Sequence, residues 1–438
     1  MDWYYVLVVF FGLLVFMLLT AIPVAFAFLL VNLFCLYLFC GGIDAWFSLI
    51  PSASAILLNE AMLAVPLFIL MGELLLHSGV AWTMCDAIDV WIGKIPGRLS
   101  HLAIIMGTIF AAMSGSGIAT AAMLGAVLIP EMRRKGYSKE MCTGPILGGS
   151  YLAPIIPPTF LGVILASVAG ISVGKLLVSA AVPGFMLGAL YLLYIGIIAK
   201  IKPGSCPAYQ GPAVTWQQRR RSLIHILPMI AIMFCVLGVI FVGIATPTEA
   251  AGLGAFATTI VVAFYRKLKK EVIAKALRST VYINAMVFFI IIGSQAFSQI
   301  LAFSGVTRGM VDFATNLQVS PKVVFLLMQL IVFIMGCFVD QTSIIMITTP
   351  MFIPIVAHFG YDLIWFCVVT LVNLSLGGIT PPFGLYLYAI KGVAPGEFTM
   401  ENIFRSVIPY IFLGVVFIIV LLLFPGSLEW VKSINFKD

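Results

Sequence analysis

Apolar stretches long enough to cross a lipid bilayer follow one another along almost the whole chain. A transmembrane helix needs about 20 consecutive apolar residues. Only 9% of the 438 residues are charged, whereas an ordinary soluble domain carries about 25%. The runs are continuously apolar, not alternating as in a membrane β-barrel. The sequence therefore predicts an all-α polytopic membrane protein, with crossings expected at 3–20, 24–40, 61–77, 142–169, 176–200, 223–243, 250–265, 280–303, 362–391 and 403–425.

A repeated pattern of prolines and glycines divides the chain into two halves. Several of these residues recur 224 positions later, and a Ser-Gly-Val triplet recurs 226 positions later. We interpret the chain as two copies of one unit. The copies are predicted at 1–200 and 223–438, joined by a cytoplasmic linker at 201–222. The recurring residues are Pro23 with Pro247, Pro130 with Pro354, Gly136-Tyr137 with Gly360-Tyr361, Pro157-Pro158 with Pro381-Pro382, and Ser78-Gly79-Val80 with Ser304-Gly305-Val306.

One further apolar block in each half is interrupted in its middle by polar residues. The blocks span 101–130 and 323–354, and their interruptions lie at 114–117 and 340–343. Each arm is shorter than the roughly 20 residues that a crossing needs. We therefore expect two re-entrant hairpins, each of which enters and leaves the membrane on the same side.

Five crossings per unit is an odd number, so the second unit should be inverted relative to the first. Positive residues test this, because they accumulate on the cytoplasmic side. If both termini are outside, all 24 Lys and Arg residues fall inside except Lys175, Arg308, Lys322, Lys432 and Lys437. The basic, amphipathic segment 266–278 is expected to form an interfacial helix on the cytoplasmic leaflet, not a nucleic-acid site.

Four interruptions of membrane helices form the candidate site: the two hairpin tips and the Pro-Pro breaks at 154–159 and 377–382. Unpaired backbone groups in a membrane are tolerated where they meet an ion, a substrate or water. Carbonyl oxygens suit a hard cation such as Na⁺, and the N-termini of half-helices suit an anion. The candidate ion-binding residues are Ser114, Gly115, Ser116, Gly117, Pro154, Ile155, Pro157, Asp340, Thr342, Gly378, Thr380 and Pro381. The candidate substrate-binding residues are Ser116, Thr159, Asp340, Thr342 and Ser343.

Each interruption also has a purely structural explanation. Ser and Gly in membrane helices often serve close packing, and prolines kink helices. The pairing of all four interruptions by one repeat favours a functional site. Asp340 supports the same interpretation, because an ionisable residue between apolar arms is functional by default. Glu249, in contrast, is explained by a favourable position at a helix start, and Glu73 by a structural role as readily as by transport.

Neither an enzyme nor a metal centre other than a Na⁺ site is predicted, and no cofactor is expected. No nucleophile–base constellation is visible. The eight cysteines form no CxxC pair, and the four histidines share no ligand spacing. A channel, the other class considered, would need an open pore lining and would have no need of paired hairpins.

Along essentially its whole length the chain resembles the large membrane subunit of tripartite ATP-independent periplasmic (TRAP) transporters. The most specific pieces are Ser-Gly-Ser-Gly-Ile-Ala-Thr-Ala-Ala from Ser114, Ile-Ile-Pro-Pro-Thr from Ile155, Ala-Thr-Pro-Thr-Glu-Ala-Ala from Ala245 and Gly-Ile-Thr-Pro-Pro-Phe-Gly from Gly378. Ile-Pro-Glu-Met at Ile129, followed by Lys-Gly-Tyr, is a further piece. Thr159 stands where that family often has serine, which keeps the hydroxyl.

The resemblance implies an elevator-type, Na⁺-driven importer of small organic anions in the bacterial inner membrane. The positive residues predict that both termini are periplasmic. The resemblance also implies two partners, a soluble periplasmic substrate-binding protein and a small four-helix membrane subunit. A related ion-coupled carboxylate carrier that works without a binding protein is the nearest alternative. C4-dicarboxylates, sialic acid and other carboxylates all remain open as substrates.

Overall fold

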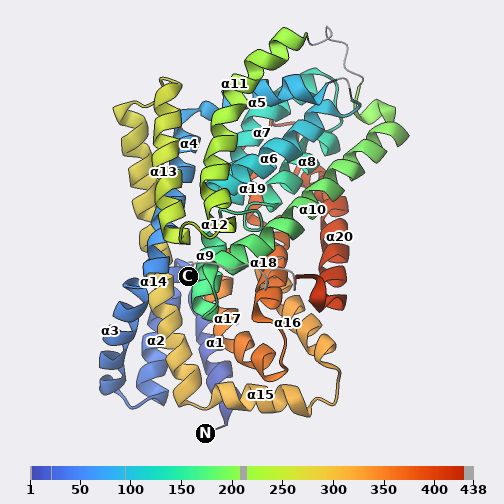
Figure 1. Ribbon diagram of the computed structural model, residues 1–438. Helices are drawn as coiled ribbons and strands as arrows, with labels where there is room; N and C mark the ends of the chain where they lie inside the picture. The colour runs from blue at the N-terminus through green and yellow to red at the C-terminus, as the bar shows by residue number, and fades with distance from the viewer. Residues whose placement is uncertain (1, 21, 94, 208–214, 429–438) are drawn as a thin grey trace.

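Every regular element in the described part of the chain is a helix, which confirms the predicted all-α class (Figure 1). The computed structural model describes residues 2–20, 22–93, 95–207 and 215–428. Lys94, Lys432, Lys437 and part of the predicted linker lie outside these ranges. Within them, seven helices are long and apolar enough to cross a membrane. They span Glu60–Ser78, Val173–Ile201, Trp216–Phe241, Pro247–Phe264, Lys270–Phe303, Gln341–His358 and Met400–Leu423.

One group of helices, the flanking group, contains the first helices of each half. Helix α4 packs against α13 and α14, α2 packs against α14, and α11 packs against α5. These contacts bury one side of each helix and leave the other side to lipid, as in α13, where Phe256 and Ile260 are exposed. The group comprises α1 Trp3–Leu19, α2 Val24–Phe39, α3 Ile43–Leu57, the 3₁₀ turn Glu60–Leu63, α4 Ala64–Ser78, α5 Val80–Ile92, α11 Trp216–Met233, the π-helical turn Phe234–Gly238, α12 Val239–Phe241, α13 Pro247–Phe264, α14 Lys270–Phe303 and α15 Val306–Asn316.

The remaining helices form the central group, in which the two predicted hairpins enclose broken helices. The first hairpin, α6 and α7, packs on α8, and the second hairpin, α16 and α17, packs on α18. Glycine pairs allow the backbones to meet, because a Cβ on Gly336 would lie 2.7 Å from Cα of Gly377. The group comprises α6 Arg98–Ser114, α7 Gly117–Arg134, α8 Lys139–Tyr151, α9 Phe160–Ala169, α10 Val173–Ile201 with the turn Pro203–Ser205, α16 Pro321–Gly336, α17 Gln341–His358, α18 Leu363–Ile379, α19 Leu385–Val393 and α20 Met400–Leu423.

The two halves share an order of elements. Helix α17 begins 224 positions after α7, and α18 begins 224 positions after α8. The short helices α5 and α15, which follow the repeated Ser-Gly-Val triplets, lie at opposite ends of the molecule (Figure 1).

One element departs from the predicted pattern. The segment 266–278 does not form a separate interfacial helix, because α14 runs unbroken from Lys270 to Phe303 and includes most of it. In the first half, by contrast, the helical run before α4 is interrupted. Asn59 caps a new 3₁₀ turn there, and its side chain accepts a hydrogen bond from the backbone N–H of Ala61 at 3.0 Å. In α14 no proline, and no glycine before Gly293, interrupts the helix. The prediction of an interfacial helix is therefore wrong.

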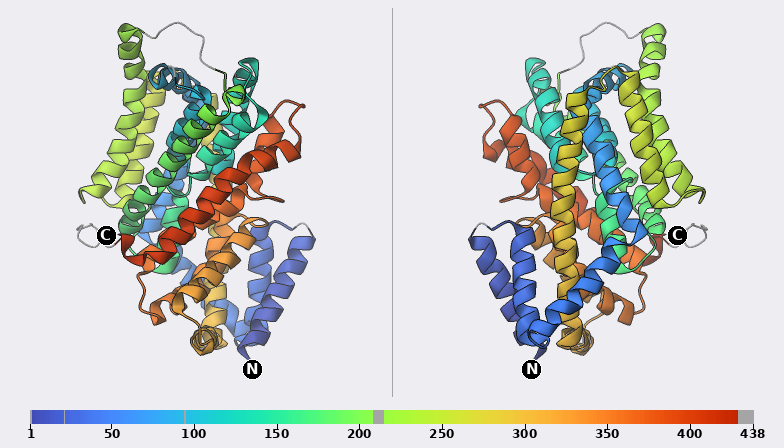
Figure 2. Two further views of the ribbon diagram at one scale, coloured as in Figure 1. Left: turned by 90° about the vertical axis from the view of Figure 1, so that its right-hand side faces the viewer. Right: turned by 90° about the vertical axis from the view of Figure 1, so that its left-hand side faces the viewer.

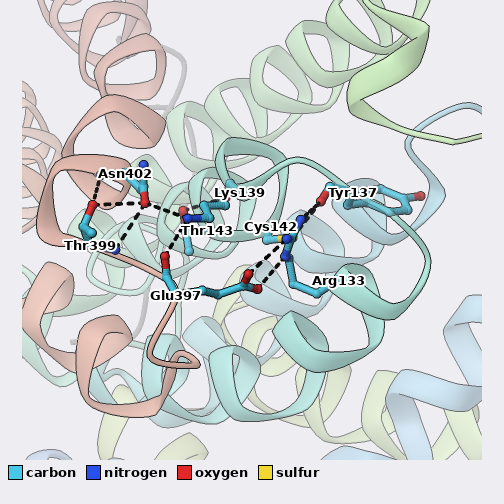
Figure 3. A network of polar contacts seen from close by, with 8 residues as sticks. All are labelled: Arg133, Tyr137, Lys139, Cys142, Thr143, Glu397, Thr399 and Asn402. Atoms are coloured by element: carbon cyan, nitrogen blue, oxygen red, sulfur yellow. Dashed lines mark hydrogen bonds and ion pairs between the residues drawn. The ribbon is translucent and has the colours of Figure 1, made fainter.

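A network of polar contacts joins the two halves at one end of the central group (Figure 3). Nε of Arg133 donates to Oε1 of Glu397 at 2.7 Å, and Nζ of Lys139 donates to the backbone oxygen of Glu397 at 2.6 Å. The hydrogen bond from Arg133 lowers the pKa of the Glu397 carboxyl. We call Arg133, Lys139 and Glu397 the cross-half clamp, because its members lie on the first hairpin, α8 and the loop before α20.

Candidate functional site

The tip of the first hairpin is a turn of two small residues, Gly115 and Ser116. Helix α6 ends at Ser114, Gly115 adopts a left-handed backbone with φ of +61°, and α7 begins at Gly117. This conformation is favourable for glycine and strained for residues with a Cβ. Ser116 caps α7 by accepting from the N–H of Ala119 at 3.3 Å. The Oγ of Ser114 lies 3.1 Å from Oγ1 of Thr120 and is thereby held against the tip.

The tip of the second hairpin is built around a carboxylate. Asp340 is the N-cap of α17: its Oδ1 accepts from the backbone N–H of Ser343 at 3.0 Å, and its Oδ2 accepts from the Ser343 hydroxyl. A carboxylate at a helix N-terminus is favoured by the helix dipole as well as by these bonds. Both Asp340 and Ser343 therefore have structural partners within the tip. Thr342 lies between them and is almost fully buried.

The two Pro-Pro breaks separate α8 from α9 and α18 from α19, and both Pro-Pro peptide bonds are cis. Thr159, the residue just before α9, is 0% exposed, and its hydroxyl has no hydrogen-bond partner among the described residues. At the second break, Oγ1 of Thr380 donates to the carbonyl of Leu376 at 2.6 Å. Gly384 approaches the chain so closely that an added Cβ would lie 2.7 Å from the Gly378 carbonyl oxygen.

These interruptions meet at a single cavity of about 130 Å³. Both tips line it, together with the start of α9, the end of α18 and the start of α19. Of the predicted residues, it is lined by Gly115, Ser116, Gly117, Asp340, Thr342 and Gly378. The other predicted residues do not line it: Ser114, Pro154, Ile155, Pro157, Thr159, Ser343, Thr380 and Pro381. Phe160 and Leu161 line the cavity directly after Thr159.

Two polar residues of the cavity were not predicted, Gln341 and Tyr386. Nε2 of Gln341 donates to the Tyr386 hydroxyl at 3.0 Å, so the second tip is hydrogen-bonded to α19. The Tyr386 ring lies over the first tip, where a Cβ on Gly117 would come within 2.3 Å of it. Gln341 could have been found as a polar residue beside Asp340 in an apolar block. Tyr386 carries no such signal, because it lies in an apolar run at no special spacing. Gly336, Ile118, Val339 and Leu385 also line the cavity.

The cavity is suited to binding and not to bond-breaking chemistry. Among the described residues that line it, Asp340 is the single carboxylate, and the other polar groups are hydroxyls, the amide of Gln341 and backbone groups at helix ends. Oxygen ligands of this kind match a hard monovalent or divalent cation. The N-termini of α7 and α17 meet at the same cavity, and helix N-termini attract negatively charged groups.

Paired helix breaks that converge on one small cavity in an all-α membrane protein are typical of secondary transporters. The sequence matches the family described as "Tripartite ATP-independent periplasmic transporter, DctM component" over residues 11–427. The chain therefore belongs to the DctM component family of TRAP transporters, as the resemblance predicted.

Relatives with named substrates lie within this family. The chain is 31% identical to the C4-dicarboxylate TRAP transporter large permease protein DctM of Pseudomonas aeruginosa, over 84% of this chain and 85% of that protein. It is 28% identical to the sialic acid TRAP transporter large permease protein SiaM of Vibrio cholerae, over 80% and 81%. These relatives are named as permease subunits and not as enzymes, so the chain is a multi-pass transporter subunit.

Two solved structures share the fold. The YdaH transporter of Alcanivorax borkumensis superposes with a TM-score of 0.66 at 13% identity, covering 89% of this chain and 90% of that one. MtrF of Neisseria gonorrhoeae superposes with a TM-score of 0.61 at 12% identity, covering 90% and 86%.

Proposed function

We propose that this chain is the large permease subunit of a Na⁺-coupled importer of small carboxylates in the bacterial inner membrane. The observation that carries the proposal is the cavity where both hairpin tips meet the ends of two broken helices. Substrate is delivered by a periplasmic binding protein, and a small four-helix subunit completes the membrane complex. C4-dicarboxylates and sialic acid, named for relatives, are the first substrates to test.

The cation binds among the oxygen atoms at the tips, and Asp340 supplies the negative charge beside it. The substrate carboxylate is attracted by the N-termini of α7 and α17. Thr159 lies directly before the cavity-lining Phe160, and its buried hydroxyl has no hydrogen-bond partner among the described residues. A small movement of α9 would bring this hydroxyl to the cavity, where the substrate would become its hydrogen-bond partner.

We also infer an inverted repeat with both termini periplasmic, in which the central group moves as an elevator past the flanking group. The placement of α5 and α15 at opposite ends supports the inversion. Separate packing of the two groups supports the movement, because most helix contacts lie within a group.

Na⁺ dependence is tested in proteoliposomes that contain this subunit, its small partner and the binding protein. Labelled succinate or sialic acid should accumulate only with an inward Na⁺ gradient, because the free energy stored in that gradient drives uptake. Equal uptake in K⁺ buffer without a Na⁺ gradient would contradict the proposal. Omission of the binding protein should abolish uptake, and uptake that persists would favour the alternative carrier that needs no such protein.

A further inference from the structure

A second pocket shares no lining residue with the cavity at the hairpin tips. It lies between α10 and α20, at the end of the molecule that carries the cross-half clamp. Its volume is about 240 Å³. Helices α10 and α20 pass side by side here (Figure 2, left), and the first turn of α8 closes the pocket from behind. We call this the α10–α20 pocket. It is lined by Ser138, Glu140, Met141, Tyr194, Ile198, Lys202, Ser205, Arg405, Ser406, Pro409 and Tyr410.

The pocket carries charges of both signs. Arg405 is already paired with Glu401 at 2.6 Å, one turn earlier on α20. Lys202 and Glu140 are exposed, and neither forms an ion pair with another described residue. One ammonium and one carboxylate therefore remain to meet a ligand, together with the hydroxyls of Ser138 and Ser205. A ligand that satisfies both charges must itself be a zwitterion.

Exposed apolar residues neighbour the pocket-lining ones along both helices. Ile197 and Ile201 on α10, and Ile408 and Phe412 on α20, are all exposed. The half-buried Tyr194, Ile198 and Pro409 belong to the lining itself. A pocket of this volume has room for several water-sized groups. That suits a small headgroup, with its acyl chains left outside on the apolar surface.

We propose that the α10–α20 pocket binds the headgroup of a zwitterionic phospholipid that carries a primary ammonium, of the phosphatidylethanolamine type. Lys202 and Arg405 hold the phosphate, and Glu140 accepts hydrogen bonds from the ammonium. The acyl chains lie along the exposed apolar side chains of α10 and α20. The lipid would then join two helices of different halves at the membrane surface.

The test is native mass spectrometry of the full-length protein in detergent micelles titrated with single lipids. The wild type should retain one phosphatidylethanolamine, severalfold more strongly than phosphatidylglycerol, which lacks the ammonium, or phosphatidylcholine, whose ammonium cannot donate. Lys202→Gln should weaken retention severalfold. Glu140→Gln should remove the preference over phosphatidylglycerol. The matched control, Lys200→Gln, changes an exposed lysine of the same helix end that does not line the pocket, and it should bind as the wild type does.

Ile198→Trp provides a second variant that fills the pocket and leaves every charge in place. It should lose the lipid while the protein stays monodisperse. Equal retention of all three lipids, or equal effects of Lys200→Gln and Lys202→Gln, would overturn the proposal. Displacement of the lipid by inorganic phosphate at matched concentration would also overturn it, because the pocket would then be a soluble-anion site.

Discussion

Asp340 illustrates how one residue serves structure and electrostatics at the same position. Its two oxygens cap α17 through Ser343, and it also places a carboxylate at the cavity. Its position between apolar arms was visible in the sequence. Its capping role could not be predicted, because the sequence of an apolar block does not show at which residue α17 begins.

Asp340→Asn separates these two roles. Asparagine caps a helix about as well as aspartate does, so the variant should insert in the membrane and have an unchanged apparent melting temperature. Because the negative charge beside the proposed cation is lost, transport should fall roughly tenfold or more and need higher Na⁺. Uptake measured against Na⁺ concentration tests this. Normal uptake with unchanged Na⁺ dependence would leave Asp340 with a structural role alone.

Asp340→Ala, which removes the cap too, should also lower stability by about 0.5–2 kcal/mol.

At the scale of elements, the breaks in the helices could be predicted and their side-chain partners could not. Prolines, glycines and polar residues interrupt an apolar run whatever surrounds it, so the tips and both Pro-Pro breaks are visible in the sequence. The partner of Gly117 is Tyr386, 269 positions later, and only the packing of α19 on α7 brings them together. The error at 266–278 has a similar cause, since a basic amphipathic pattern is shared by interfacial helices and by the projecting end of a longer helix.

The packing of α7 against α19 leads to a prediction about Gly117. In Gly117→Ala the new Cβ would lie 2.3 Å from the ring and hydroxyl of Tyr386, so one helix must shift. Overpacking of this kind costs about 1–3 kcal/mol. Uptake should be lost and the apparent melting temperature should fall. Gly392→Ala on α19, where nothing lies within 4 Å of the added Cβ, is the matched control and should be silent. Restoring space with Tyr386→Leu should recover stability in the double variant, and a double variant as unstable as Gly117→Ala would contradict this explanation.

At the scale of the whole molecule, the proposed inversion relates the ends of α7 and α17. Arg134 and His358 are the last residues of these helices, they are 224 positions apart, and both are exposed. The count of crossings and the positions of the positive residues predicted that these two helix ends lie on opposite sides of the membrane. The sequence could not show how the two units interlock, because the contacts between them join residues more than 200 positions apart.

Single cysteines at Arg134 and His358 test the inversion in a background without the eight native cysteines. In intact cells with a permeabilised outer membrane, an impermeant maleimide should label His358→Cys from outside. It should label Arg134→Cys only after the inner membrane is opened. Labelling of both cysteines from the same side would refute the inverted repeat.

The cross-half clamp has a consequence for the order in which the protein is made. Arg133 finds its carboxylate on Glu397, 264 positions further along the chain. At roughly 5–20 residues per second, the ribosome needs about 13–50 seconds to bridge that distance. During this interval the end of the first hairpin lacks its anionic partner. The clamp can close only after Glu397 has been made, late in synthesis, so it cannot stabilise the first half before then.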